Sequence, residues 1–234
     1  SALNTGSFDD RAPSISKSAG QGIYGIVWTQ YGPWGPDGDI VAAEIDYSGL
    51  LRIAPFYLDS STNDDSRPRI STPAEIPGQR TLLVTWQRNY APFSNSGRLH
   101  CAAITTNPAQ VLVNRWDLSA LLGIAGSTMA FEPSVDSDGL RFAVAHTEVA
   151  AALPGTGHSN TYVSTLAVDG INLRVHESRA VLQNSGPQTF GTSIASRYGG
   201  GLAESRSYGI VCGSDAISVL GWLYDDAAAM VTAV

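Results

Sequence analysis

Short apolar runs separated by turn residues follow one another along the whole chain. Four of these runs, each just after a glycine-containing turn, are continuously or almost continuously apolar: residues 24–28, 82–86, 142–146 and 208–212. Runs of this length and composition are typical of strands that are buried on both faces. Another apolar run follows each of them, then a turn signal such as Asp-Gly, then a more polar run. The pattern predicts an all-β protein.

The same order of elements recurs four times. Each copy opens with a short strand, at residues 13–16, 68–71, 133–136 and 192–195, and the first three of these begin with proline. The third strands are expected at 40–45, 99–104, 162–168 and 217–223, and the fourth at 51–58, 110–116, 172–182 and 229–234. Apolar inner strands with a polar outer strand are typical of propeller blades.

We therefore predict an all-β fold: a β-propeller with four blades of four antiparallel strands. It forms a single domain over residues 1–234, with blades at approximately 10–65, 66–128, 129–187 and 188–234. The alternative is a β-sandwich protein with sixteen strands in two domains, which explains the number of strands but not the recurring order of motifs.

The first repeat resembles a class of bacterial extracellular β-propeller repeats. Their pattern is Pro-x-Ile-Ala, then Gly-x-x-Leu-Val-x-Trp, then Asp-Ile-x-Ala-x-x-Val-Asp-x-x-Gly. Residues 11–51 match it at Pro13, Trp28, Asp39, Ile40, Ala42, Asp46 and Gly49. Later repeats keep the strands and lose several of these residues. The resemblance implies the propeller fold and export from the cell, not one activity.

Two further features concern packing. The run 116–123 interrupts the strand pattern, and Asp117 or Ser119 can cap a short helix that Gly123 ends. Cys101 and Cys212 lie in different repeats, too far apart in the predicted ring to bond, so we expect two buried free thiols.

Composition and charge exclude some classes of function. The net charge is −7 and the 14 basic residues are scattered, so nucleic acid is not an expected partner. No apolar stretch is long enough for a membrane-spanning helix. We expect an extracellular or cell-surface protein.

The loops that join the second and third strands offer the best candidate binding site. In a propeller these loops lie on one face, around the central channel. Aromatic rings beside carboxylates and amides suit sugars, because a pyranose face stacks on the ring while its hydroxyls form hydrogen bonds. The predicted ligand-binding residues are Tyr31, Trp34, Asp37, Asp39, Asn89, Tyr90, Phe93 and Asn95. The alternative is that the aromatic residues fold over the blade edges as local core.

Signals for catalysis and metal binding are weak. Asp37-Gly38-Asp39 and residues 136–139 suit ordinary turns better than calcium loops, and we expect no metal and no cofactor. A sialidase-like glycoside hydrolase is an alternative, because Arg11 and Arg67 stand at the starts of first strands. That family also has Ser-x-Asp-x-Gly-x-x-Trp turns, and residues 134–139 misplace the glycine by one position.

The sequence thus favours a recognition module that binds carbohydrate or another surface polymer over an enzyme. A structural or protein-binding scaffold is the other alternative, with a protein partner or a homodimer as possible assemblies.

Overall fold

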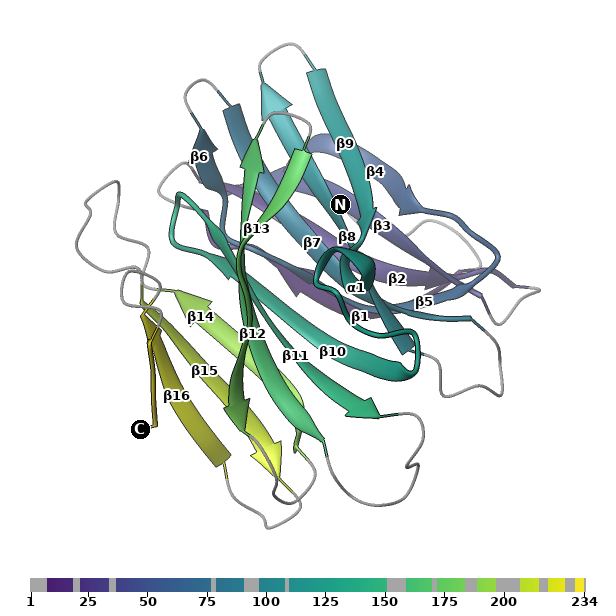
Figure 1. Ribbon diagram of the computed structural model, residues 1–234. Coiled ribbons are helices and arrows are strands. Elements are labelled where there is room, and N and C mark those ends of the chain that lie inside the picture. The colour runs from purple at the N-terminus through teal and green to yellow at the C-terminus, as the bar shows by residue number, and fades with distance from the viewer. Residues whose placement is uncertain are drawn as a thin grey trace.

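The computed structural model (Figure 1) describes residues 8–18, 22–33, 37–76, 79–90, 97–107, 110–150, 159–169, 172–183, 189–196, 207–214, 219–225 and 230–233. Most of these residues lie in strands, which form four antiparallel sheets. The predicted all-β class and the four successive sheets are therefore confirmed.

Each sheet contains consecutive strands in chain order. Sheet 1 consists of β1 (Asp9–Ile15), β2 (Ile23–Tyr31), β3 (Gly38–Asp46) and β4 (Leu51–Asp59). Sheet 2 consists of β5 (Asp64–Ile70), β7 (Gln79–Asn89), β8 (Gly97–Asn107) and β9 (Gln110–Asp117), with the short strand β6 (Ala74–Ile76) also paired to β7. Sheet 3 consists of β10 (Thr128–Ser137), β11 (Phe142–Ala150), β12 (Asn160–Asp169) and β13 (Asn172–Gln183). Sheet 4 consists of β14 (Thr189–Ser196), β15 (Ser207–Ser214), β16 (Val219–Asp225) and β17 (Met230–Ala233). The sequence pattern did not predict β6.

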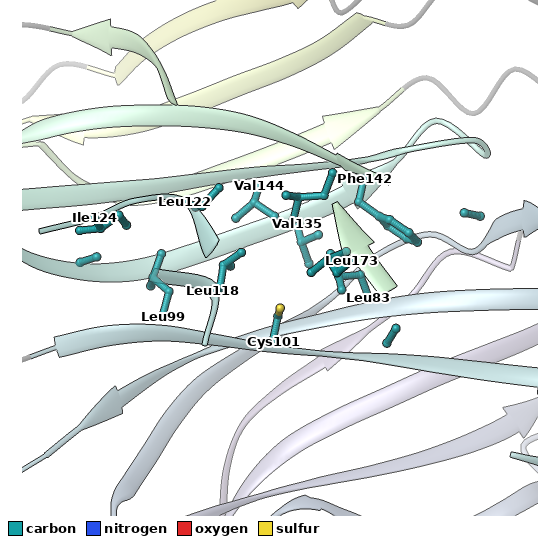
Figure 2. Close-up of a cluster of buried hydrophobic side chains, with 14 residues drawn as sticks. Leu83, Leu99, Cys101, Leu118, Leu122, Ile124, Val135, Phe142, Val144 and Leu173 are labelled. Atoms are coloured by element: carbon teal, nitrogen blue, oxygen red, sulfur yellow. The ribbon is translucent and has the colours of Figure 1, made fainter. Parts of the chain in front are cut away.

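Apolar side chains fill the spaces between successive sheets. One core cluster joins Val27, Ile40, Ala42 and Leu58 of sheet 1 to Ile70, Leu82, Val84 and Trp86 of sheet 2. Figure 2 shows the next cluster, in which Leu83, Leu99 and Cys101 of sheet 2 pack with Val135, Phe142, Val144 and Leu173 of sheet 3. Because neighbouring residues of a strand point to opposite faces, the continuous apolar run of β7 supplies both clusters, with Leu82 and Val84 in the first and Leu83 in the second.

The last residue of the second strand's apolar run is buried in each of the first three repeats. Trp28, Trp86 and His146 are between 0% and 5% exposed. Cys101 is a free, fully buried thiol, as predicted. The side chain of Cys212 lies outside the described residues.

The outward faces of the two terminal sheets are less well covered. Ile70, Val135 and Ile194 occupy equivalent positions in β5, β10 and β14, and they are 6%, 5% and 7% exposed, whereas Ile15 in β1 is 58% exposed. In sheet 4, Ile210 is 1% exposed and its neighbour Val211 is 43% exposed. The outward face of sheet 1 is thus exposed at Ile15, although Trp28, Val41 and Ala43 on the same face form a buried cluster. Closure of the four sheets into a ring stays a prediction.

The interruption in the strand pattern is a single helical turn. Helix α1 (Leu118–Leu121) follows β9, and the side chain of Asp117 accepts a hydrogen bond of 2.9 Å from Ala120 N. Asp117 is thus the cap, while Ser119 Oγ accepts from Leu99 N and ties the helix to β8. Gly123 has a φ of +68°, as expected where the helix ends. The described part of the chain contains no helix long enough to cross a bilayer.

A buried carboxylate connects all four sheets where their first strands end. Asp136 Oδ1 accepts hydrogen bonds from the N–H and hydroxyl of Thr72, at 3.0 and 2.6 Å, and from Ser137 N at 2.9 Å. Asp136 Oδ2 accepts from Lys17 Nζ at 2.6 Å and from Ser196 N and Oγ at 2.7 and 3.0 Å. Burial by itself raises the pKa of Asp136, but the ion pair with Lys17 and the hydrogen bonds from Ser196 and Thr72 outweigh burial and lower it below its usual value. We call Asp136, Lys17, Thr72 and Ser196 the hub.

Replacement of Asp136 by alanine should destabilise the whole protein. The change leaves the buried donors of Thr72 and Ser196 without their acceptor, so we expect the free energy of unfolding to fall by about 3 kcal/mol. Chemical denaturation measures this loss. The control is Asp169→Ala, which removes an exposed ion pair with Arg174 and should cost less than about 1 kcal/mol. Equal losses in the two variants would contradict the role of the hub.

Ile15 and Ile70 offer a matched test of how well the outward face of sheet 1 is covered at β1. Ile70→Ala removes a buried side chain between sheets 1 and 2 and should lower the free energy of unfolding by about 2–4 kcal/mol. Ile15→Ala changes a side chain that is 58% exposed and should cost less than about 1 kcal/mol. A large loss from Ile15→Ala would show that another surface covers this face in solution.

Candidate functional site

The first strands of all four sheets surround one cavity. Its volume is about 310 Å³, and its lining consists of Ala12 from β1, Arg67 and Arg69 from β5, Glu132 and Pro133 from β10, and Thr192 from β14. Ala12, Arg67, Glu132 and Thr192 follow one another at intervals of 55 to 65 positions in the sequence, so only the packing of the sheets brings them together. A concave site lined by several elements is the usual form of a small-ligand site.

The same backbone irregularity shapes the cavity in three sheets. Ala12, Arg67 and Glu132 each precede a proline, and their φ angles are +49°, +54° and +53°. Each lies where the register of its strand shifts against the second strand of the sheet. A left-handed conformation costs a residue other than glycine about 1–2 kcal/mol. Three such residues that line one cavity mark it as the strongest candidate site, because backbone strain concentrates at functional sites.

Charged groups dominate the lining. Arg67 Nη1 donates to Glu132 Oε1 at 2.5 Å, and the side chains of these two residues are 53% and 22% exposed. The Glu132 carbonyl in turn accepts a hydrogen bond from the hydroxyl of Thr192. Arg69 donates to the carbonyl oxygen of its neighbour Pro68 at 3.0 Å. Two guanidinium groups and one carboxylate give the cavity a net positive charge within a protein of net charge −7.

The hub lies further along the same strands. Asp136 is four residues beyond Glu132 on β10, and Thr72 is five residues beyond Arg67. Asp136 is 4% exposed, and the residues of the hub are not among those that line the cavity. The opposite end of β5, at Asp64, lies beside Asn89 at the end of β7.

The structure brings two of the predicted site residues together through a residue that the prediction did not include. Asp64 accepts hydrogen bonds from Tyr31 OH at 3.4 Å and from Asn89 Nδ2 at 3.0 Å. The guanidinium of Arg11 lies 5.0 Å from the centre of the Tyr31 ring, and Asp9 holds this guanidinium in an ion pair. Tyr31 and Asn89 are therefore bound into contacts between sheets 1 and 2.

Two predicted carboxylates lie close to each other at the start of β3. Burial, together with the negative charges of Asp37 and Asp59, raises the pKa of Asp39 to about 6. Among the residues that the structure describes, no group of three His, Cys, Asp or Glu side chains is placed to hold a metal ion. Asp37 and Asp39 are thus two neighbouring carboxyl groups to which the described residues add no third metal ligand.

Tyr90 is the exposed aromatic residue of the predicted set. It follows β7, is 46% exposed, and its hydroxyl lies 3.0 Å from His100 Nε2. Trp34, Phe93 and Asn95 lie outside the described residues, so their part in a site stays a prediction.

Sequence reasoning missed the cavity and a second polar network near it. Arg88 binds Asp65 through two hydrogen bonds of 2.7 Å and forms an ion pair with Asp59 at 2.8 Å, which links the end of β4 to sheet 2. The sequence does show that Ala12, Arg67 and Glu132 each precede a proline at the start of a repeat. It does not show their positive φ angles, which turn these residues toward the cavity.

Asp39 should contribute to the pH dependence of stability. Because the folded state raises the pKa of Asp39 to about 6, it takes up a proton more readily than the unfolded chain. Its contribution to the free energy of unfolding therefore increases as the pH falls from 8 toward 5. Asp39→Asn should lack this increase, whereas Asp169→Asn should keep it. Thermal unfolding between pH 5 and pH 8 tests this, and identical pH profiles for wild type and Asp39→Asn would contradict it.

Comparisons with known proteins show the fold of the chain but no family. No protein-family model matches it, and no curated protein matches it. The sialidase of Trypanosoma rangeli in complex with the inhibitor DANA matches 96% of the chain with a TM-score of 0.58 and 12% identity, and its complex with sialic acid matches with a TM-score of 0.56 and 11% identity. The chain spans only 38% and 37% of these sialidase chains. An α-L-arabinanase of Cellvibrio cellulosa complexed with arabinohexaose has a TM-score of 0.47 and 12% identity over 96% of the chain and 77% of its own length. The similarity to the sialidase chains shows that the arrangement of the sheets is like that of a β-propeller protein.

Proposed function

We propose that the chain is a carbohydrate-recognition module that binds its ligand in the cavity between the four first strands. The observation that carries this proposal is the convergence of Arg67, Arg69 and Glu132 on one cavity, with two of the three in a left-handed conformation. A protein keeps such strain where a fixed arrangement of groups is useful.

The charges of the cavity favour an acidic saccharide. A guanidinium group binds a carboxylate through two parallel hydrogen bonds, and such charge-assisted bonds are stronger than bonds between neutral groups. Within the part of the chain that the structure describes, Arg69 forms no ion pair, and its guanidinium donates to a carbonyl of its own strand. A sugar carboxylate is therefore the group that the cavity fits best, and sialic acid, the ligand of one similar sialidase structure, is a saccharide of this class.

The aromatic residues of the same end of the strands extend the proposed site. Tyr90 presents a ring that is 46% exposed, and Trp34 and Phe93 belong to the loops after β2 and β7. A sugar that extends from the cavity to Tyr90 would meet an aromatic face on which its C–H groups can stack. We therefore assign Tyr90 to the outer part of the site, while the part of Trp34 and Phe93 stays a prediction.

We also propose that the sheets belong to a propeller-like ring in a protein at the cell surface or outside the cell. Lys17 of sheet 1 donates both to Asp136 of sheet 3 and to the carbonyl of Ser196 in sheet 4, which supports an arrangement of all four sheets around one axis. Likeness to sialidase chains supports the same arrangement.

Recognition fits the cavity better than hydrolysis does. Most glycoside hydrolases use two carboxyl groups that flank the scissile bond, whereas sialidases use a tyrosine as the nucleophile. No tyrosine stands among the described residues that line the cavity. Glu132 is the one carboxylate among the described residues that line the cavity, and it is held in an ion pair by Arg67. Its established contact suits a role in orienting Arg67 toward a ligand.

Arg69→Ala should weaken binding of acidic glycans without unfolding the protein. The loss of one charge-assisted hydrogen-bonding group predicts an affinity that is lower by a factor of about 10–100. Titration of wild type and variant with sialyllactose and with hexuronic acid oligosaccharides, followed by tryptophan fluorescence and calorimetry, measures the change.

Arg174→Ala is the matched control, because it also removes an arginine but one that is 68% exposed on the outer strand of sheet 3. It should bind as the wild type does. Binding that survives Arg69→Ala would place the ligand elsewhere, release of free sugar by the wild type would favour a hydrolase, and no binding to any glycan would favour a scaffold.

A further inference from the structure

Three rings form a continuous column from the core of sheet 2 to its surface. The Trp86 ring is fully buried and stacks on the His100 ring, with 6.0 Å between centroids and 28° between planes. The His100 ring is tilted by 56° to the Tyr90 ring at 6.3 Å, and it also reaches the Tyr90 hydroxyl at 3.0 Å. His100 is 9% exposed and Tyr90 is 46% exposed, so the column ends in a ring that meets solvent.

The chemistry of His100 suits a fixed hydrogen bond. Burial, together with the positive charge of Arg88, lowers the pKa of His100 to about 4, which leaves the ring neutral near pH 7. Burial also raises the pKa of Tyr90, so its hydroxyl keeps its proton. A neutral imidazole has one nitrogen that accepts a hydrogen bond, and the Tyr90 hydroxyl can donate to Nε2.

A second sheet shows that the arrangement around Tyr90 is specific. In sheet 3 the cross-strand pair at the equivalent position has its histidine on the second strand instead of the third. His146 on β11 stacks on Tyr162 of β12, with 5.8 Å between ring centroids and 21° between planes. His146 is fully buried and its Nε2 contacts Glu148, so this pair stabilises the interior. In sheet 2 the histidine instead contacts an exposed tyrosine at the end of the strand.

We infer that His100 is a positioning residue that holds the Tyr90 ring in place for a sugar to stack on it. The inference rests on the proposed function, since it assigns Tyr90 the outer part of the carbohydrate site. An exposed tyrosine samples several side-chain rotamers, and binding has to restrict them at a cost in entropy. The ring of His100 is itself held by its stack on Trp86, and its hydrogen bond to the Tyr90 hydroxyl restricts the rotamers of Tyr90 before the ligand arrives.

A double-mutant cycle separates this role from simple support of the fold. Tyr90→Phe keeps the ring and removes the hydrogen bond, and His100→Leu removes the bond from the other side; each should lower glycan affinity about fivefold. If His100 acts only through Tyr90, the double variant should bind no more weakly than either single variant. Equal affinity of Tyr90→Phe and wild type would overturn the inference, as would full additivity of the two losses.

Tyr57→Phe provides a matched control. Tyr57 is 45% exposed and its hydroxyl donates to Gln30 at 2.8 Å, so the variant removes a similar bond from a similar ring on β4. It should bind as the wild type does, and an equal loss of affinity would overturn the assignment to Tyr90.

A measurement without ligand keeps the two proposals distinguishable. The ¹⁵N chemical shift of His100 Nε2 should change in Tyr90→Phe and stay unchanged in Tyr57→Phe, and an unchanged shift in both would overturn the inference alone. Failure of the wild type to bind any glycan would overturn the proposed function, and with it the ligand role of Tyr90, even where the shift confirms the contact.

Discussion

The buried carboxylate of Asp136 is the constraint on which the arrangement of the sheets depends. Burial removes the hydrating water of a carboxylate, and this costs several kcal/mol of free energy unless hydrogen bonds and an opposite charge replace the water. Here Lys17 supplies the charge, and backbone and hydroxyl donors of Thr72 and Ser196 supply the remaining bonds. These groups come from three other sheets, so the carboxylate is satisfied only when all four first strands meet at one place.

The cavity follows from this convergence. Because the first strands are joined at the hub, the bulged residues four or five positions earlier also face one another, and Ala12, Arg67 and Glu132 line a common space. Their left-handed backbone would be unfavourable in an isolated strand. Contacts between sheets hold it in place, such as the hydrogen bonds from Ile70 N to Ser14 Oγ and from Ile194 N to Ser134 Oγ.

Polar contacts also join sheets 1 and 2 at both ends. Arg80 binds Glu44 in a buried ion pair of 2.6 Å, and Arg88 binds Asp59 and Asp65 at the other end of β7. Such pairs contribute little net stability when both partners must be desolvated, but they disfavour any other alignment of the sheets. They therefore fix the alignment of sheet 1 with sheet 2, and so the position of the end of β7, where Tyr90 follows, relative to Asp59 and Asp65.

The sequence by itself determined the class of fold and the repeated unit. Continuous apolar runs, proline at the strand starts and turn residues are local signals, and they located all four sheets, the helical turn with its two candidate caps Asp117 and Ser119, and the burial of Cys101. The tertiary structure alone decided which residues of different repeats meet. The cavity, the hub and the contact between His100 and Tyr90 depend on φ angles, on register and on the packing of sheets about an axis, and the spacing of residues along the chain carries none of these. For the same reason the exposure of Ile15, at a position where the other repeats bury an aliphatic side chain, could be seen only after the sheets were placed.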